Sequence, residues 1–243
     1  MKNIFEIIEK EIEIIDSGYN SGQYNMDFDV ERLEQFKSKS APAMFRLYGW
    51  KPWAVSLGFN QKESDIDANK CKEKNIEIVR RPTGGRAVLH AEEITYSVVC
   101  PIPDEFSPHD IYRDIHILLL KGLKKLNIPD LDFSKSQPDF RQLYNKEIRS
   151  ISCFASSARW EIESQGKKVV GSAQRIFGNT LLQHGSILLN HGYNVLADII
   201  NTDDETNRKA LREWTLEHSI SASEATGRTI TYDEASKAIL SCF

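Results

Sequence analysis

Residues 80–90, Arg-Arg-Pro-Thr-Gly-Gly-Arg-Ala-Val-Leu-His, constrain this chain more than any other segment. They follow an apolar run at residues 76–79 and end in Ala-Val-Leu, so they read as a turn between two strands. Two adjacent glycines let the backbone turn, or approach a ligand, where a Cβ would clash. The flanking guanidinium groups are planar, permanently charged donors that suit a phosphate or a carboxylate. On these residues alone, a β-turn with basic edges and a ligand-binding loop both remain open.

The composition limits the classes of function. The chain has 243 residues, 40% of them hydrophobic and 27% charged, enough for one well-buried domain or two small ones. A net charge of −4 argues against general affinity for nucleic acid, which needs a broadly basic surface. The first residues mix acids with apolar side chains, unlike a secretory signal, and no apolar run approaches ~18 residues. We therefore expect a cytoplasmic protein with no nucleic-acid or membrane partner.

The four cysteines, Cys71, Cys100, Cys153 and Cys242, lie far apart and form no C-x-x-C pair. This spacing is typical of reduced thiols in a cytoplasmic protein and does not favour structural zinc. A free cysteine is most often a small buried apolar residue, so a reactive role for any of them needs further evidence.

Hydrophobic periodicity predicts a mixture of strands and helices. The predicted strands cover residues 11–15, 43–48, 53–59, 76–79, 94–100, 157–163, 168–176 and 181–189. The predicted helices cover residues 21–37, 64–74, 110–126, 195–200, 205–214 and 232–240, with Ser21 and Thr231 as caps of the first and last. Asp16-Ser17-Gly18 should close the first strand, the last three strands should form an antiparallel meander, and residues 127–150 should be a surface loop. The pattern predicts one α+β domain over residues 1–243, with a helical part at residues 194–243.

A second unusual stretch, residues 166–175, reads Gly-Lys-Lys-Val-Val-Gly-Ser-Ala-Gln-Arg. Period-two alternation gives this strand one face with Lys168, Val170, Ser172 and Gln174 and another with Val169, Gly171 and Ala173. Small residues in mid-strand weaken a sheet unless something must lie close against them. Lys168 is either an exposed strand lysine or a charge placed for function, and the spacing leaves both open.

A third stretch, residues 182–189, reads Leu-Gln-His-Gly-Ser-Ile-Leu-Leu. His184 followed by Gly185 inside an apolar strand fits a core histidine and fits one wall of a pocket equally well. Spacing alone does not separate these alternatives.

Taken together, the three stretches resemble the lipoyl/octanoyl-transfer branch of the biotin- and lipoate-protein ligase superfamily. Residues 80–90 match R-R-x-[ST]-G-G-x-x-V-x-H, residues 168–174 match K-[VI]-x-G-S-A-Q, and residues 182–189 match L-x-H-G-[ST]-[IL]-L. Weaker support comes from Asn25-Met26-Asp27, near the family's N-M-x-x-[DE], and from residues 46–52. The motifs occur in family order across residues 12–190. The resemblance implies the family's catalytic-domain fold, a mixed and largely antiparallel sheet flanked by helices.

The resemblance also implies a pocket for an eight-carbon acyl chain under the Gly-Gly loop, with Lys168 at the carbonyl end. The positions carried over for substrate binding are Arg81, Thr83, Gly84, Gly85, Arg86, Ala87, Val88, His90, Gly171, Ser172, Ala173, His184 and Gly185. Arg86 is a departure, because many ATP-dependent ligases have a third glycine there. That replacement disfavours wrapping of an adenylate, so we predict no cofactor and no metal.

The family contains ATP-dependent ligases, octanoyltransferases that use an acyl carrier protein, and amidotransferases that move acyl groups between proteins. Cys153 precedes Lys168, as the nucleophile does in one octanoyltransferase type. Transfer from a thioester benefits from such a cysteine, and a nearby ammonium favours its reactive thiolate. We predict that Cys153 and Lys168 are catalytic. They would carry an octanoyl group from octanoyl-acyl carrier protein to the acceptor lysine of lipoyl domains such as glycine-cleavage H protein.

Three alternatives remain. The chain could be an ATP-dependent lipoate-protein ligase, or a lipoyl/octanoyl amidotransferase acting between lipoyl domains. From another class, it could be an acyl-binding protein without catalytic activity. Only about fifty residues follow the motif region, whereas ATP-dependent relatives often add a C-terminal domain, so length favours the transferase.

Overall fold

The computed structural model describes residues 3–8, 11–134, 160–202 and 204–243. Its helices are α1 (Ile4–Ile8), α2 (Gly22–Lys37), α3 (Ala68–Glu73), α4 (Pro108–Lys124), α6 (Leu196–Ile199), α7 (Glu205–His218), α8 (Ala222–Thr226) and α9 (Tyr232–Leu240), with 3₁₀ turns η2 (Glu63–Asp65) and η4 (His191–Val195). Its strands are β1 (Ile12–Asn20), β2 (Ala43–Trp50), β3 (Ala54–Leu57), β4 (Glu77–Arg80), β5 (Val88–His90), β6 (Glu93–Pro101), β7 (Asp132–Phe133), β8 (Ile162–Ser164), β9 (Lys167–Lys168), β10 (Val170–Phe177) and β11 (Thr180–Leu188).

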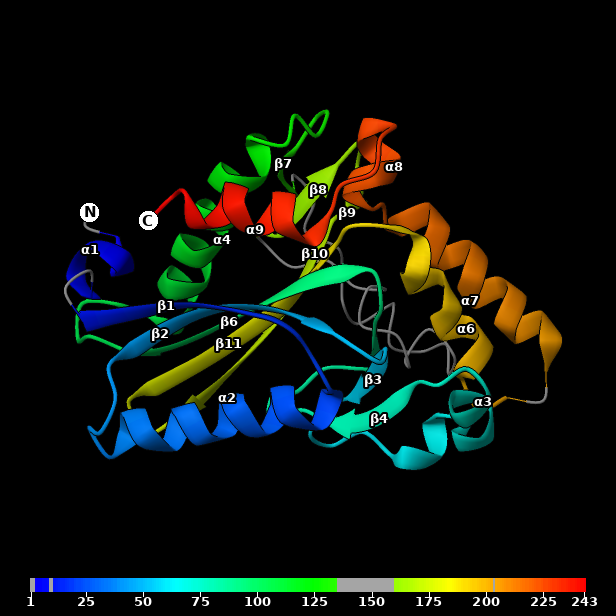
Figure 1. Ribbon diagram of the computed structural model, residues 1–243, viewed down its shortest axis with the longest axis horizontal. Helices are drawn as coiled ribbons and strands as arrows, with labels where there is room; N and C mark the ends of the chain where they lie inside the picture. Colours follow the sequence, from blue (N-terminus) through cyan, green and yellow to red (C-terminus); the bar gives the residue numbers. More distant parts are fainter. Residues whose placement is uncertain (1–2, 9–10, 135–159, 203) are drawn as a thin grey trace.

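The main sheet has the strand order β1-β2-β6-β11-β10 and runs through the middle of the molecule (Figure 1). β1 is parallel to β2, and the other neighbours are antiparallel. A smaller sheet, β4-β3-β5, lies beside it, and β7-β8-β9 form a third. The predicted α+β class, with a mixed and largely antiparallel sheet flanked by helices, is confirmed.

Helices cover both faces of the main sheet. In Figure 1, α4 and α9 lie on one side of it and α2 on the other. Alternation along β2 directs Phe45 and Leu47 into the larger core with Ile115 of α4, while Met44 packs with Leu33 of α2. Each such side chain, fully buried, contributes roughly 1.5–3 kcal/mol. Because both faces are buried, polar groups on the α2 side need partners inside the protein.

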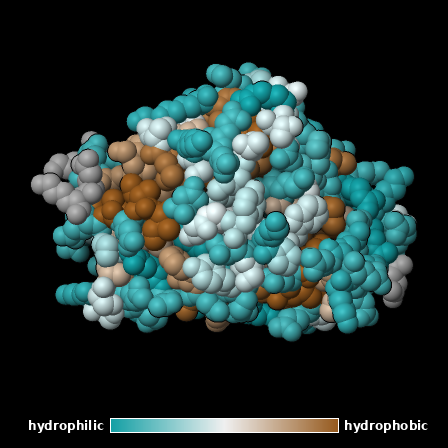
Figure 2. Space-filling view, in the orientation of Figure 1, coloured by the Kyte–Doolittle hydropathy of each residue, from teal (hydrophilic) through white to brown (hydrophobic). Residues whose placement is uncertain are grey.

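The two chain ends lie together at one end of the main sheet (Figure 1). The rings of Phe5 and Phe243 meet edge to face, with centroids 5.4 Å apart. Figure 2 shows apolar surface at this end, where Ile7 and Phe243 are partly exposed. The C-terminal residues therefore complete the layer formed by α1, α4 and α9.

The first strand is longer than predicted. Asp16-Ser17-Gly18 does not close it, and pairing with β2 resumes at Tyr19 after a register shift. Gly18 adopts φ +60°, a left-handed conformation that glycine reaches without strain. A bulge at this glycine absorbs the extra residues, so that the strand continues.

The antiparallel pairings of the predicted meander are present, but they are divided between two sheets. β8 pairs with β9 and β7 in the third sheet, while β10 pairs with β11 in the main sheet. The chain bends at Val169, whose amide donates to Ile162, and both Val169 and Val170 are buried in one core. The predicted alternation therefore holds only from Val170 onward. Residues 157–159 and 135–150 of the predicted strand and loop lie outside the described residues.

Candidate active site

The floor of the candidate site is the face of the main sheet that α2 covers. Strand register places side chains from four neighbouring strands opposite one another on this face. One row contains Gly171, Ser186, Thr95 and Tyr48, and the next contains Ala173, His184, Ser97 and Arg46. Because Gly171 and Ala173 have almost no side chain, the floor is open at β10, as the alternation of this strand predicts.

A pocket lies on this floor. Its lining residues are Met26, Tyr48, Trp50, Ser56, Arg81, Val88, His90, Thr95, Gly171, Ser172, Ala173, His184, Gly185 and Ser186. They come from the main sheet, from the β4-β3-β5 sheet, from α2 and from the segment between β4 and β5. The mixture of aromatic walls with a few polar groups is typical of small-molecule sites.

Arg81 braces the Gly-Gly loop from inside. Its guanidinium donates to the carbonyl oxygens of Ser56 (2.8 Å), Gly84 (3.0 and 3.2 Å) and Arg86 (2.6 Å). Gly85 adopts φ +93°, which other residues rarely reach. The buried guanidinium thus stabilises the turn, a role that the sequence, read for phosphate binding, did not suggest.

Most of the predicted site residues meet here. Arg81, Val88, His90, Gly171, Ser172, Ala173, His184 and Gly185 line the pocket. Thr83, Gly84, Gly85, Arg86 and Ala87 belong to the loop that leads from β4 to β5. Lys168 is not among the lining residues and lies in β9, and Cys153 falls outside the described residues.

His90 sits in a chain of hydrogen bonds between a hydroxyl and a carboxylate. Its Nε2 lies 2.7 Å from Oγ of Ser56, and its Nδ1 lies 2.8 Å from Oε1 of Glu93. Thr95 and Ser186 also donate to Oε1 of Glu93, at 2.6 and 2.9 Å. All of these residues are buried. The ring of Trp50 stacks on that of His90, with centroids 3.9 Å apart. Trp50, Thr95 and Ser186 also line the pocket.

His184 sits in a second chain of the same kind. Its Nε2 lies 2.5 Å from Oγ1 of Thr83, and its Nδ1 lies 3.8 Å from Oδ2 of Asp29. Burial lowers the pKa of His184, although the neighbouring Asp29 opposes that shift. Burial alone would raise the pKa of Asp29, but contacts with His184, Arg46 and Ser97 outweigh it and lower the pKa. The chain therefore combines a carboxylate with a neutral imidazole.

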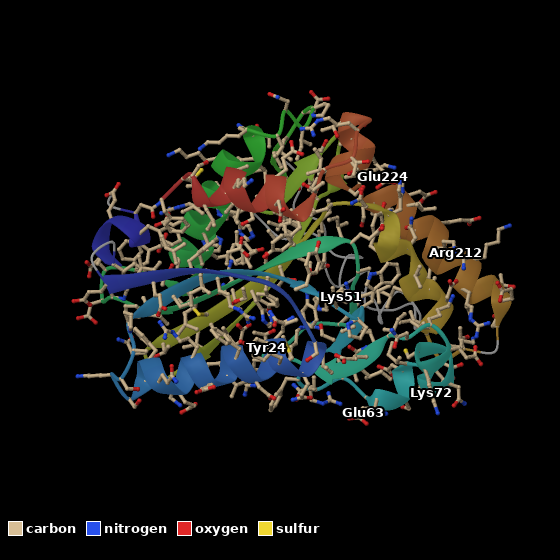
Figure 3. The ribbon with its side chains drawn as sticks, viewed as in Figure 1. Tyr24, Lys51, Glu63, Lys72, Arg212 and Glu224 are labelled. Carbon is tan, nitrogen blue, oxygen red and sulfur yellow. The ribbon has the colours of Figure 1, made fainter. Side chains whose placement is uncertain are left out.

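Arg46 supplies the counter-charge for Asp29. Its Nη1 lies 3.0 Å from Oδ1 of Asp29, and both side chains are fully buried. The guanidinium also stacks between the rings of Phe28 and Tyr48, 4.1 and 4.0 Å from their centroids. Tyr24, labelled on α2 in Figure 3, lies further off at 6.0 Å. This ion pair ties α2 to β2 beneath the pocket.

Lys168 is paired with a carboxylate that sequence reasoning missed. Its Nζ donates to Oε1 of Glu161 at 3.0 Å and lies 2.9 Å from Oε2. Both residues are buried, so each charge has its partner inside the protein. The nearby His116 has its pKa lowered to about 3, first by burial and then by the charge of Lys168.

Two of the other cysteines are poorly suited to nucleophilic attack. Burial raises the pKa of Cys71 to about 11 and that of Cys100 to about 12. At neutral pH both are therefore protonated thiols.

The opposite face of β10 has its own polar contacts. Ser172 accepts from the hydroxyl of Tyr96 at 2.7 Å and lies 2.9 Å from Nε2 of His116 in α4. A Cβ on Gly185 would lie 2.5 Å from Oγ of Ser172, so glycine is required where β11 crosses this contact. Together these contacts fix the backbone of the strand that forms the open edge of the pocket.

The missed residues differ in how visible they are in the sequence. Asp29 occupies the acidic position of N-M-x-x-[DE], whereas Asp27, the acid quoted with that motif, is exposed and accepts from Gln23. Ser56 and Glu93 carried no signal. The link of Ser56 to His90 depends on the pairing of β3 with β5, and that of Glu93 depends on the turn between β5 and β6. None of the quoted motifs includes Glu161, so the sequence did not indicate it.

In the part of the chain that the structure describes, no group of three or more His, Cys, Asp and Glu side chains could hold a metal ion. The helices of the same residues include none with the length and apolar character to span a membrane.

The fold is that of the lipoate protein ligases. A bi-partite lipoate protein ligase from Thermoplasma acidophilum matches with a TM-score of 0.72, covering 96% of this chain and 82% of that one at 19% identity. A lipoate-protein ligase A bound with ATP gives a TM-score of 0.68, covering 96% and 83% at 19% identity. These likenesses define the class of fold.

Sequence comparison gives the family. Residues 21–243 match the lipoyl protein ligase A/B catalytic domain. The chain is 36% identical to Octanoyltransferase LipM of Anoxybacillus flavithermus, over 97% of this chain and 86% of that protein. It is 34% identical to Octanoyltransferase LipM of Bacillus subtilis, over 92% and 82%. The chain belongs to the lipoyl protein ligase A/B catalytic-domain family.

Proposed function

We propose that this chain is an octanoyltransferase of protein lipoylation. It takes the octanoyl group from octanoyl-acyl carrier protein onto Cys153 and passes it to the acceptor lysine of lipoyl domains, including glycine-cleavage H protein. One observation carries the proposal: relatives named octanoyltransferase match this chain at 31–36% identity over 85% or more of its length. We expect the reaction to take place in the cytoplasm.

The shape of the pocket supports an acyl substrate. Its floor crosses four strands, which at ~4.8 Å per strand spans roughly 14 Å, longer than an extended eight-carbon chain. Gly171 and Ala173 leave room for the chain at β10, and Met26 and Val88 supply apolar surface.

The pair of Lys168 and Glu161 supports a thiolate mechanism. An ammonium held in place by a buried carboxylate can favour the thiolate of a nearby cysteine without giving up its own proton. In the first half-reaction the Cys153 thiolate attacks the octanoyl carbonyl. The new C–S bond replaces that of the carrier, whose thiolate leaves and takes a proton from solvent.

The test is intact mass measurement after incubation with octanoyl-acyl carrier protein. We expect one octanoyl adduct in the wild type and none in Cys153→Ala. Cys242→Ala is the matched control, because Cys242 is a partly accessible free thiol, and it should keep the adduct. No adduct in the wild type, or an unchanged adduct in Cys153→Ala, would contradict the thioester mechanism. Activity in Cys153→Ala that needs lipoate and ATP would favour the ligase alternative.

A further inference from the structure

The hydrogen bonds around His90 decide which of its nitrogens can accept a proton. Arg81 donates to the hydroxyl of Ser56 at 3.0 Å, and a guanidinium cannot accept, so the Ser56 proton points to Nε2 of His90. Nδ1 then carries the ring proton and donates to Glu93. A hydroxyl, an imidazole and a carboxylate in this order form a proton-accepting unit, because the carboxylate stabilises the imidazolium that results.

The other basic groups near the pocket are less suited to accept a proton. The Lys168 ammonium is paired with Glu161 and has no lone pair to offer. His116 contacts Ser172 from the α4 side of the sheet, and its pKa of about 3 makes it a weak base. His184 faces a carboxylate that Arg46 already neutralises. Among the described residues, this leaves His90.

A surface groove lies next to the pocket and shares the side chain of Trp50 with it. Four aromatic side chains and two carboxylates line it: Tyr19, Trp50, Trp53, Tyr232, Glu92 and Glu93. Trp50 also lines the pocket, and Glu93 is the partner of His90.

The groove favours a cation. Aromatic faces attract an ammonium group, and Glu92 and Glu93 add negative charge. The pKa of Tyr19 is raised, first by burial and then by the negative charges of Asp233 and Glu92. Glu93 has one buried carboxylate oxygen, Oε2, with no hydrogen-bond partner in the described residues. A lysine side chain matches this combination of charge and shape.

We propose that His90, oriented by Glu93, is the general base for the acceptor lysine, and that this lysine enters along the groove. The inference rests on the proposed function, because it concerns the second half-reaction. The acceptor ammonium gives one proton, through the Ser56 hydroxyl, to Nε2 of His90. The neutral amine attacks the Cys153 thioester, the C–N bond forms as the C–S bond breaks, and the second proton goes to the Cys153 sulfur.

The test separates loading of the enzyme from its discharge. Octanoyl-enzyme is prepared from the wild type, His90→Gln and Glu93→Gln, and then mixed with either a lipoyl domain or hydroxylamine. Hydroxylamine is uncharged near neutral pH and needs no base. We expect discharge to the lipoyl domain to slow about 100-fold or more in both variants, the size of a general-base effect. Discharge by hydroxylamine should stay within about twofold of the wild type.

Three results would overturn the proposal: equal slowing with both nucleophiles, no slowing with either, or failure of both variants to load. If only His90→Gln fails to fold or load, Glu93→Gln decides. Failure of the wild type to load would instead contradict the proposed function.

The groove is tested by the concentration dependence of discharge. Glu92→Gln should raise the KM for the lipoyl domain about tenfold while leaving loading and the maximal rate of discharge unchanged. Glu213→Gln, an exposed carboxylate on α7, is the matched control and should change none of the three. An unchanged KM in Glu92→Gln would remove the groove from the route of the lysine.

Discussion

The pocket contains two chains of hydrogen-bonded side chains. Each consists of a hydroxyl, a histidine and a carboxylate, but the distances between these groups differ. Ser56, His90 and Glu93 are linked by contacts of 2.7 and 2.8 Å, both within hydrogen-bonding range. In the chain of Thr83, His184 and Asp29, the first contact is 2.5 Å, but the carboxylate lies 3.8 Å from the ring. In the first chain, the short contact to a carboxylate holds the imidazole of His90. In the second chain, the short contact to the Gly-Gly loop holds the imidazole of His184.

The carboxylates differ in what balances their charge. Asp29 has the buried guanidinium of Arg46 at 3.0 Å, whereas the contacts recorded for Glu93 are with His90, Thr95 and Ser186. A compensated carboxylate has little to offer a protonated imidazole, and an uncompensated one stabilises it. Similar side chains can thus serve as a structural anchor in one chain and a proton acceptor in the other.

The largest expected difference is in stability. Asp29→Asn leaves the buried Arg46 without its counter-charge, which should lower the free energy of unfolding by about 3–5 kcal/mol. Glu93→Gln leaves no buried cation without a counter-charge and should lower the free energy of unfolding by only about 1–3 kcal/mol. Urea unfolding measures both, and Asp27→Asn, exposed on the same helix, should stay within about 0.5 kcal/mol. Equal losses for the two buried carboxylates would break the comparison.

Acid should destabilise the protein through its buried neutral imidazoles. The pKa of His184 is lowered and that of His116 falls from 6.5 to about 3, in each case first because of burial. Below about pH 6.5 the unfolded chain binds protons that the folded chain does not, so stability falls as the pH falls. For His116 this amounts to about 2 kcal/mol between pH 7 and pH 5. Unfolding measured across this range should give a flatter profile in His116→Gln and in His184→Gln, and an unchanged slope in both would show that neither is buried neutral.

The hydroxyls give the smallest and most selective difference. Thr83→Val removes the hydroxyl that is hydrogen-bonded to His184 and should cost about 1 kcal/mol, with slower loading and unchanged discharge of the loaded enzyme. Ser56→Ala should cost a similar amount of stability but slow discharge to the lipoyl domain instead. Measuring loading and discharge in both variants would sharpen the comparison, and the same kinetic profile in both would remove it.

Local features of the chain were predictable because they depend on neighbouring residues. Ser21 and Thr231 cap α2 and α9 as expected, each accepting from an amide three residues on. Alternation correctly placed Gly171 and Ala173 on the bare face of β10. It failed at Val169, where a bend directs two successive valines into one core. A bend of this kind depends on the third sheet, which periodicity does not reveal.

The sequence by itself determined the family, the class of fold and the loop that carries Gly84 and Gly85, because these depend on motifs, periodicity and backbone freedom. Tertiary structure decided which partners the functional groups have. Thr83 reaches His184 across 101 positions, and Ser56 reaches His90 across 34. The first contact follows from how the loop packs against the main sheet. The second follows from the register of β3 with β5, where a one-residue shift would turn the side chain to the other face. The loop identifies the site. The packing of the loop and the strands decides which histidine contacts a carboxylate whose charge no buried guanidinium balances.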